Sequence, residues 1–483
     1  MAPYAYEPLS AQDGSFLVFE AVHAHMHHGG IAIFDAGALR TKAGGVDVAR
    51  IRQHVATRLA FAPRYRQRLA FVPLTNAPVW VDDAHFNLAY HVRHTALPRP
   101  GDERQLKEEC ARIMSQQLDR GKPLWEMWIV EGLEDDRFAL VLKTHHSMAD
   151  GVSAVGFLAL LLSTTPEAEV GAPEAWEARP APSPCQLLQD ALARRLRMPL
   201  DLGRELGAAL VDPRRLGDRL MESIAAVAEL VRTGIRPPPD TPLNRPIGPH
   251  RKLGWLTLDL DAVKGVKNRF GVTLNDVVLA TVAGAVRAFL QRRRIEPAGL
   301  DFRTVVPVSV RSEMTKGGPG NQVSAWLTAL PIGEADPGRR LMRVSAETRR
   351  LKETKQERAA TVLGRVAEMA GPALLTLGVR LAARMHPYNL IVTNVPGPPQ
   401  PLYLLGARML EGYPLVPLFA NQGVGVALCS YDGRLCWGFN ADFDMVPDLD
   451  VFIDGVWRSF AELHDAAGLA RPAEPSAAVP DGR

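Results

Sequence analysis

The chain has 483 residues, of which 47% are hydrophobic and 23% charged, and this globular composition excludes a largely disordered protein. Because the length exceeds what one ordinary core accommodates, we expect two domains of similar size. The 56 basic residues are nearly balanced by 53 acidic ones, so the net charge of +3 gives no global signal for nucleic-acid binding. Nucleic acid is therefore not a predicted partner.

The four cysteines and the N-terminal residues indicate the cellular compartment of the protein. Cys110, Cys185, Cys429 and Cys436 lack the spacing of metal ligands, so we expect reduced, mostly structural thiols. The first residues lack the basic segment and apolar stretch of a signal peptide. No apolar run reaches the ~18 residues of a membrane-spanning helix. These features predict a cytoplasmic protein that would meet a membrane only from its surface.

The first third of the chain alternates strand-like and helix-like segments, and Asp47 is well placed to cap the first predicted helix. Strands are expected at residues 30–34, 125–131 and 138–145. Helices are expected at residues 48–59, 105–118 and 152–162. This alternation predicts a mixed α/β domain over residues 1–165.

A change of composition separates this domain from a second one. Residues 166–184 are rich in Pro, Ala and Glu, which indicates a linker, and residues 186–235 have the pattern of helices. We expect a linker and helical crossover over residues 166–250.

The second half returns to an α/β pattern. Its alternation at residues 255–260 and its apolar run at 305–310 predict strands, and residues 273–294 predict a long helix. A second α/β domain is therefore expected over residues 251–470. The Pro- and Ala-rich residues 471–483 are expected to be a disordered tail.

The segment richest in chemical information is His145-His146-Ser147-Met148-Ala149-Asp150-Gly151, which directly follows a predicted strand. Adjacent strand residues point to opposite faces, so only one histidine can face a given cavity. A histidine on a rigid strand end, with an ordinary pKa of about 6.5, suits a general base near neutral pH. Most lone histidines are structural, and so short a pattern also arises by chance. A pair that ends an apolar strand before Asp-Gly nevertheless favours catalysis.

This His-His-x-x-x-Asp-Gly pattern resembles the signature of acyltransferases with the chloramphenicol-acetyltransferase-like fold, which include peptide-synthetase condensation domains. More closely, the chain resembles the bacterial bifunctional wax ester synthase/diacylglycerol acyltransferase family from Pro8 to about Leu463. Further motifs of the family occur in order at residues 9–17, 118–120, 123–126, 241–244, 248–250, 275–278, 307–309 and 394–398. The resemblance implies an α/β protein with two chloramphenicol-acetyltransferase-like domains, joined by a helical crossover, with the active site at their interface.

The resemblance also implies a direct acyl transfer without a cofactor. His146 would accept the proton of a fatty alcohol or of the free hydroxyl of diacylglycerol, and the oxygen would attack the thioester of acyl-CoA. His145 is expected to support His146. Asp150, followed by Gly151, is expected to be a structural tether, with Arg311 as its candidate partner.

Other polar residues are weaker candidates for the site. Asn275 and Asp276 could contact substrate, but capping and packing of the long helix explain them at least as well. Asn321, Gln322 and Ser324, in and after a Gly-rich turn, could donate to the oxyanion.

A His-rich stretch near the N-terminus departs from the family pattern. It contains His23, His25, His27 and His28, and alternating histidines on a strand could bind a metal. Polar residues at the end of a sheet explain the stretch as well, and the family requires no metal. We therefore expect no metal site.

Two alternatives to this enzyme remain open. One is a related alcohol acyltransferase whose donor is bound to a carrier protein, and the other is a lipid-binding or lipid-body-coating protein without catalysis. The basic segment 339–358, with a local net charge of +5, is expected to be a solvated helix face. It could also bind CoA phosphates or anionic lipids, so peripheral contact with the inner membrane or a lipid droplet is a secondary expectation.

Overall fold

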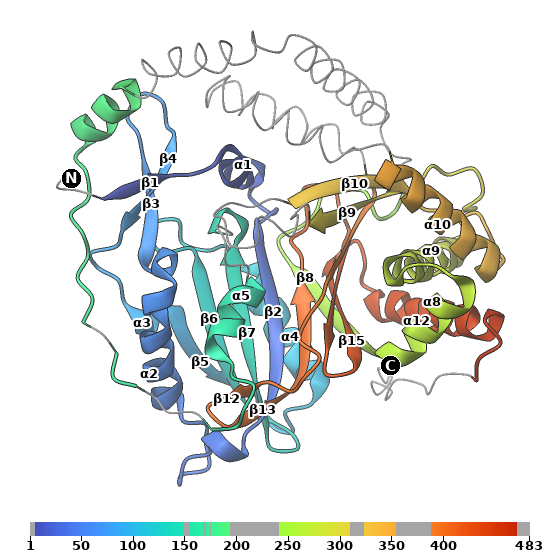
Figure 1. The fold of residues 1–483 in the computed structure, drawn as a ribbon, viewed down its shortest axis with the longest axis horizontal. Coiled ribbons are helices and arrows are strands. Elements are labelled where there is room, and N and C mark those ends of the chain that lie inside the picture. Colours follow the sequence, from blue (N-terminus) through green and yellow to red (C-terminus); the bar gives the residue numbers. More distant parts are fainter. Residues whose placement is uncertain are drawn as a thin grey trace, which may run out of the picture.

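Two mixed α/β halves lie side by side in the computed structural model (Figure 1). The structure describes residues 5–148, 154–167, 171–173, 175–193, 241–309, 323–353 and 388–470. Within them, each half is built on a six-stranded sheet, and the N-terminal half has a further sheet of three strands.

The N-terminal sheet combines strands from both ends of the chain. Its order is β12 (Tyr403–Leu404), β13 (Ala407–Leu415), β2 (His27–Asp35), β7 (Arg137–His145), β6 (Trp125–Leu133) and β5 (Val92–Ala96). All neighbours are antiparallel except β5 and β6. Because β13 pairs with β2, the C-terminal half of the chain is tied into the N-terminal sheet.

The remaining elements of this half surround the sheet. The small sheet has the order β1 (Tyr6–Pro8), β4 (Pro78–Asp82) and β3 (Gln67–Phe71). The helices are α1 (Ala11–Phe19), α2 (Val48–Arg58), α3 (Leu88–His91), α4 (Glu103–Ser115) and α5 (Ala154–Leu161). Short 3₁₀ turns are η1 (Gly37–Leu39), η2 (Leu59–Phe61), η3 (Pro63–Arg66) and η4 (His146–Met148). A further helix covers residues 184–193.

Helices α4 and α5 cover opposite faces of the N-terminal sheet. Neighbouring residues of a strand point to opposite faces. Lys143 of β7 donates to the carbonyl of Ile113 in α4, at 3.1 Å. On the other face, Trp125, which lies opposite Thr144, contacts the ring of Phe157 in α5. The histidine pair therefore ends a strand that is packed on both sides.

The C-terminal sheet has the order β10 (Val323–Ala329), β9 (Arg303–Ser309), β11 (Leu390–Val395), β14 (Val424–Tyr431), β15 (Arg434–Asp442) and β8 (Arg251–Asp259). Its helices are α8 (Leu260–Phe270), α9 (Leu274–Arg292), α10 (Pro337–Glu353) and α12 (Leu449–Ala466), and they lie on the outer side of this half (Figure 1). Of the described residues, only α9 is long and apolar enough to cross a membrane. It packs against α10 and α12, and 72% of its apolar window is buried in the protein, as for a core helix.

Local sequence signals explain where the helices begin. The side chain of Asp47 accepts from the N–H of Arg50 and caps α2, as predicted. Asp102 and Gln105 form a capping box at α4, and Thr273 and Asp276 form one at α9. Each box satisfies backbone N–H groups that the first helical turn leaves without a partner.

The halves meet through α4 and the crossing strand β13. Helix α4 packs against β8, and β13 packs against β14 and β15. Tyr413 of β13 stacks on Trp255 of β8, with ring centroids 5.2 Å apart, and its hydroxyl lies 3.0 Å from Oγ1 of Thr257. The interface is therefore a packed extension of the two cores.

The predicted strands and helices of both halves are confirmed wherever the structure describes them. The predicted helix 105–118 ends at Ser115 instead, because Gln116 has an extended backbone. Of the predicted helical region 186–235, only residues up to 193 are described, and the predicted tail 471–483 lies outside the described residues. The domain ranges 1–165, 166–250 and 251–470 stay a prediction.

Candidate active site

Backbone hydrogen bonds fix the histidine pair at the end of β7. The N–H of His145 donates to the carbonyl of Leu124 at 2.9 Å, and the N–H of His146 donates to the carbonyl of Met26 at 2.8 Å. His145 is the last residue of the strand, opposite His27, and His146 opens the turn η4. The two imidazoles consequently meet different surroundings.

His145 is enclosed and held by its neighbours. Its side chain is 1% exposed. The N–H of Ser147 donates to Nδ1 at 3.1 Å, and the hydroxyl of Ser147 lies 2.7 Å from the same atom. Since Nδ1 accepts, we assign the ring proton to Nε2, which lies 3.7 Å from Oε2 of Glu20. His145 is thus oriented by Ser147 and Glu20 and is not open to a substrate.

His146, by contrast, is half-buried and aromatic on two sides. Its ring stacks on Phe16 of α1, with centroids 4.5 Å apart and planes at 16°. The ring of His28 meets it edge-on at 4.6 Å. Burial, with smaller effects from His28 and His145, holds the pKa of His146 well below its ordinary 6.5. The imidazole is therefore neutral at pH 7, as a general base must be.

Nδ1 of His146 is buried and has no hydrogen-bond partner among the described residues. Because an enclosed nitrogen is closed to a substrate hydroxyl, Nε2 is the candidate basic nitrogen. A base at Nε2 requires the ring proton on Nδ1.

A buried carboxylate lies beside the pair. Glu20 follows α1, and its side chain is 1% exposed. Its Oε2 accepts from Nε of Arg120 at 2.8 Å. Burial acts to raise its pKa, but the His145 imidazole and the Arg120 guanidinium outweigh burial and lower the pKa to about 2. Glu20 is therefore ionised at neutral pH.

Three further histidines near the pair, His25, His27 and His28, are also neutral. Burial is the main reason that the pKa of His25 and that of His28 are lowered to about 4, and that the pKa of His27 lies well below 6.5. His27 donates from Nε2 to the carbonyl of Met114 at 2.9 Å. Among the described residues no group of three or more His, Cys, Asp or Glu side chains could hold a metal ion. The prediction that no metal or cofactor is used stays a prediction.

Several predicted site residues lie outside the described residues, and these are Asp150, Gly151, Arg311, Asn321 and Gln322. Ser324 lies in β10, opposite Val308. The structure therefore describes the histidine pair but not its predicted tether or the Gly-rich turn.

Asn275 and Asp276 lie in the first turn of α9. Both carboxylate oxygens of the buried Asp276 are already used: one accepts from the N–H of Thr273 at 2.9 Å, and the other accepts from the hydroxyl of Thr348 at 2.6 Å. This favours capping over substrate contact for Asp276.

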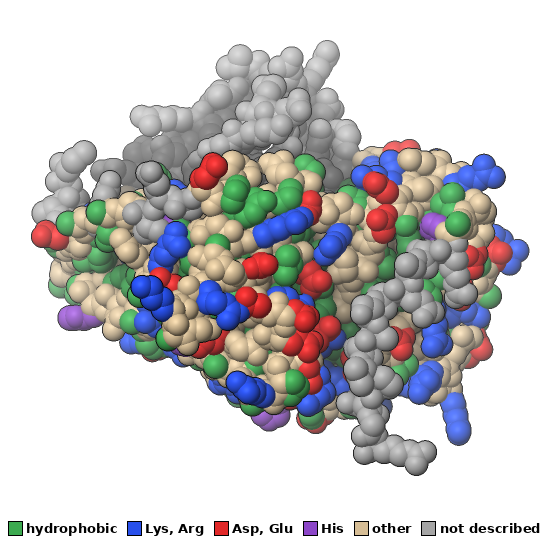
Figure 2. Space-filling model, turned by 90° about the horizontal axis from the view of Figure 1, so that it is seen from below, with side chains coloured by type: hydrophobic (Ala, Val, Ile, Leu, Met, Phe, Trp, Pro, Cys, Tyr) green, Lys and Arg blue, Asp and Glu red, His purple; other side chains and the backbone are tan. Residues whose placement is uncertain are grey.

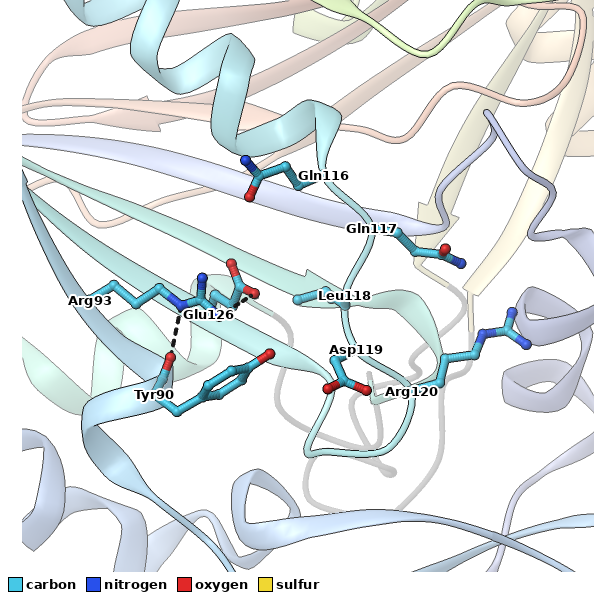
Figure 3. A pocket seen from close by; sticks show the side chains of 8 residues that line it. All are labelled: Tyr90, Arg93, Gln116, Gln117, Leu118, Asp119, Arg120 and Glu126. Carbon is cyan, nitrogen blue, oxygen red and sulfur yellow. Dashed lines mark hydrogen bonds and ion pairs between the residues drawn. The ribbon is translucent and has the colours of Figure 1, made fainter.

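A polar cavity of about 470 Å³ lies beside the loop that follows α4. It is lined by Tyr90, Arg93, Gln116, Gln117, Leu118, Asp119, Arg120 and Glu126 (Figure 3). Arg93 pairs with Glu126 at 3.2 Å, and the side chain of Arg120 points away from both (Figure 3). One of its lining residues, Arg120, pairs with Glu20 beside the histidines.

Comparison with known proteins decides the family. The catalytic domain of the wax ester synthase/diacylglycerol acyltransferase family matches residues 9–278, and the C-terminal domain of the same family matches residues 319–464. The chain belongs to this family. It is an acyltransferase, and the predicted family and enzyme class are confirmed.

Individual members of the wax ester synthase/diacylglycerol acyltransferase family agree with this assignment. A Mycobacterium tuberculosis protein named as a probable diacylglycerol O-acyltransferase is 34% identical over 471 residues, which cover 94% of this chain and 95% of the relative. The wax ester synthase/diacylglycerol acyltransferase from Marinobacter aquaeolei VT8 is 28% identical in sequence. Its structure matches with a TM-score of 0.68, covering 96% of this chain and all of that one.

A more distant match concerns the fold alone. The first condensation domain of the calcium-dependent antibiotic synthetase is 16% identical, with a TM-score of 0.60, and covers 98% of this chain and 99% of that one. The predicted fold, two chloramphenicol-acetyltransferase-like α/β domains, is therefore confirmed.

The sequence analysis missed three parts of the site. It did not connect Phe16, Glu20 and Arg120 with the histidines, although Phe16 and Arg120 belong to family motifs at residues 9–17 and 118–120. Glu20 carried no signal of its own in the sequence.

Proposed function

We propose that this protein transfers a long-chain acyl group from acyl-CoA to the hydroxyl of diacylglycerol or of a fatty alcohol, with Nε2 of His146 as the general base. The observation that carries the proposal is the half-buried, neutral His146 at the end of β7, in a chain of this acyltransferase family. The names of the relatives, which include diacylglycerol O-acyltransferases and a wax ester synthase, support this class of substrates.

The chemistry balances without a covalent enzyme intermediate. Nε2 of His146 takes the hydroxyl proton as the oxygen attacks the thioester carbonyl. The tetrahedral intermediate then collapses, the C–S bond breaks, and the proton passes to the departing CoA thiolate. General-base help of this kind contributes about 10²–10⁴-fold, and the alignment of the two substrates supplies much of the remainder.

Water must be kept from the thioester because hydrolysis competes with transfer. The stacked ring of Phe16 covers one side of the base and serves this purpose. On the same proposal, Asp150 tethers the loop after His146 through Arg311, His145 supports His146 from behind, and Asn321, Gln322 or Ser324 donates to the oxyanion.

Peripheral contact with a membrane or lipid droplet remains part of the proposal, since the acceptors are lipids. On the face in Figure 2, Lys and Arg side chains are interspersed with Asp and Glu side chains. A mixed surface favours apolar over purely electrostatic attachment. Cytoplasmic localisation stays a prediction.

The test is an assay of the purified full chain with palmitoyl-CoA and, side by side, a diacylglycerol and hexadecanol. We expect release of CoA together with the matching ester, and little release without an acceptor. The ratio of the two esters gives the acceptor preference. Release of CoA without an ester from either acceptor would contradict the proposal, and ester formation only from a carrier-protein thioester would favour the alternative donor.

A further inference from the structure

We propose that Glu20 is a positioning residue of the active site, whose carboxylate orients His145 and locks helix α1, and with it Phe16, against His146. This rests on the proposed function only in taking His146 as the base.

The carboxylate of Glu20 joins three separate parts of the chain. Nε of Arg120, in the loop after α4, donates to Oε2 at 2.8 Å, and a second guanidinium nitrogen donates to the same oxygen. The N–H of Met26, just before β2, donates to Oε1 at 3.4 Å. Nε2 of His145, at the end of β7, lies 3.7 Å from Oε2.

The contact with His145 determines how its ring is held. Ser147 occupies Nδ1, so the protonated Nε2 faces the carboxylate of Glu20. A buried negative charge favours this tautomer and this ring orientation, as a carboxylate behind a catalytic or metal-bound histidine does. The ring of the residue next to the base is thereby held by hydrogen bonds at Nδ1 and faces a negative charge 3.7 Å from Nε2.

Through Arg120, Glu20 also influences the position of His146, the proposed base. Arg120 also donates to the carbonyl of Leu17 at 3.1 Å, so the end of α1 is bound to the loop after α4 at two points. The N–H of Glu20 donates to the carbonyl of Phe16 at 3.1 Å. The ring of Phe16 stacks on His146. A shift of Glu20 would therefore move Phe16 and His145 together, and both lie next to the base.

The sharpest test compares Glu20→Gln with a matched control. Asp82→Asn removes another buried carboxylate that pairs with an arginine, because Asp82 is 5% exposed and accepts from Nε of Arg179 at 2.9 Å. Asp82 lies in β4 of the small sheet, away from the histidines. Both variants exchange an ionised oxygen for an amide of the same shape.

We expect Glu20→Gln to lower kcat by about tenfold or more, equivalent to ~1.4 kcal/mol in the barrier. KM for both substrates should stay within about twofold, because substrate binding is not the interaction removed. Asp82→Asn should keep kcat. A Glu20→Gln enzyme with wild-type kcat, or an equal loss in Asp82→Asn, would overturn the proposal.

A readout independent of turnover is the ¹⁵N spectrum of the histidine rings. His145 should show the Nε2–H tautomer in the wild type, and its Nε2 resonance should shift in Glu20→Gln because a neutral amide replaces the carboxylate that faces it, whether or not ester formation is detected. An unchanged His145 signal would overturn the proposal even in an active enzyme. Conversely, an inactive wild type with the expected change at His145 would fault only the proposed function.

If Glu20→Gln does not fold, the partner provides the test, because the side chain of Arg120 is 39% exposed and tolerates exchange. Arg120→Gln should lower kcat, and Arg120→Lys, which keeps the charge, should recover most of it. Equal kcat in Arg120→Gln and the wild type would overturn the proposal.

Discussion

At the scale of single residues, the site depends on two adjacent histidines with opposite surroundings. His145 is hydrogen-bonded by Ser147 and faces an ionised carboxylate, whereas His146 meets the rings of Phe16 and His28. Strand alternation alone predicts that only one of the pair faces a cavity. It does not predict Phe16, because that contact joins segments far apart in the sequence.

The lowered pKa of His146 leads to a prediction for the pH dependence of catalysis. Burial disfavours the protonated ring, so the base stays available below its ordinary pKa of 6.5. In a profile of kcat/KM against pH, we expect the acid limb to have its midpoint below pH 6.5. A midpoint at or above pH 6.5 would show that the imidazole is not shielded as described.

At the scale of elements, local signals in the sequence predict where helices and strands begin, but they do not predict which strands pair. Asp47 and the apolar run of β7 identify a helix start and a strand directly from the sequence. The sequence contains no such signal that β13 joins the N-terminal sheet beside β2, since strand partners are set by tertiary contacts. The same limit applies to the end of α4, where Lys143 of β7 donates to the carbonyls of Ile113 and of Gln116, the residue after the helix.

The crossing of β13 over the C-terminal sheet requires a glycine. A Cβ at Gly438 of β15 would clash with the carbonyl oxygen of Pro414 in β13. We expect Gly438→Ala to destabilise the protein by about 1–3 kcal/mol, measured by urea unfolding.

The control for this substitution is Gly455→Ala in helix α12. A Cβ there would have its nearest neighbour, in Ala285, at an ordinary 3.7 Å. The stability of the Gly455→Ala protein should equal or slightly exceed that of the wild type, because alanine favours a helix more than glycine does. A loss of stability no larger for Gly438→Ala than for Gly455→Ala would contradict the close approach of β13 and β15.

At the scale of the whole molecule, a buried arginine joins the two halves beside the histidine-rich segment. The guanidinium of Arg251, in β8, donates to the carbonyls of Gly248 and His23 and lies 3.9 Å from the carboxylate of Asp442. The backbone N–H of Arg251 donates to the hydroxyl of Ser115 at the end of α4. The seam between the halves is thus fixed next to the histidine-rich segment.

Removal of Arg251 should therefore lower the stability of the protein more than removal of a surface cation does. Arg251→Leu leaves the buried carboxylate of Asp442 without its cation, which costs about 3–5 kcal/mol. Arg408→Leu, which breaks a surface pair with Asp432, should cost at most about 1 kcal/mol. Equal midpoints of thermal unfolding for the two variants would contradict this view of the seam.

The central claim is that His146 is the base, and the most direct measurement is kcat/KM of His146→Ala with palmitoyl-CoA and the preferred acceptor. His94→Ala, on β5 at the protein surface, is the control. We expect a fall of about 10²–10⁴-fold in His146→Ala, with thermal stability close to that of the wild type, and wild-type activity in His94→Ala. Activity retained in a folded His146→Ala enzyme would contradict the account.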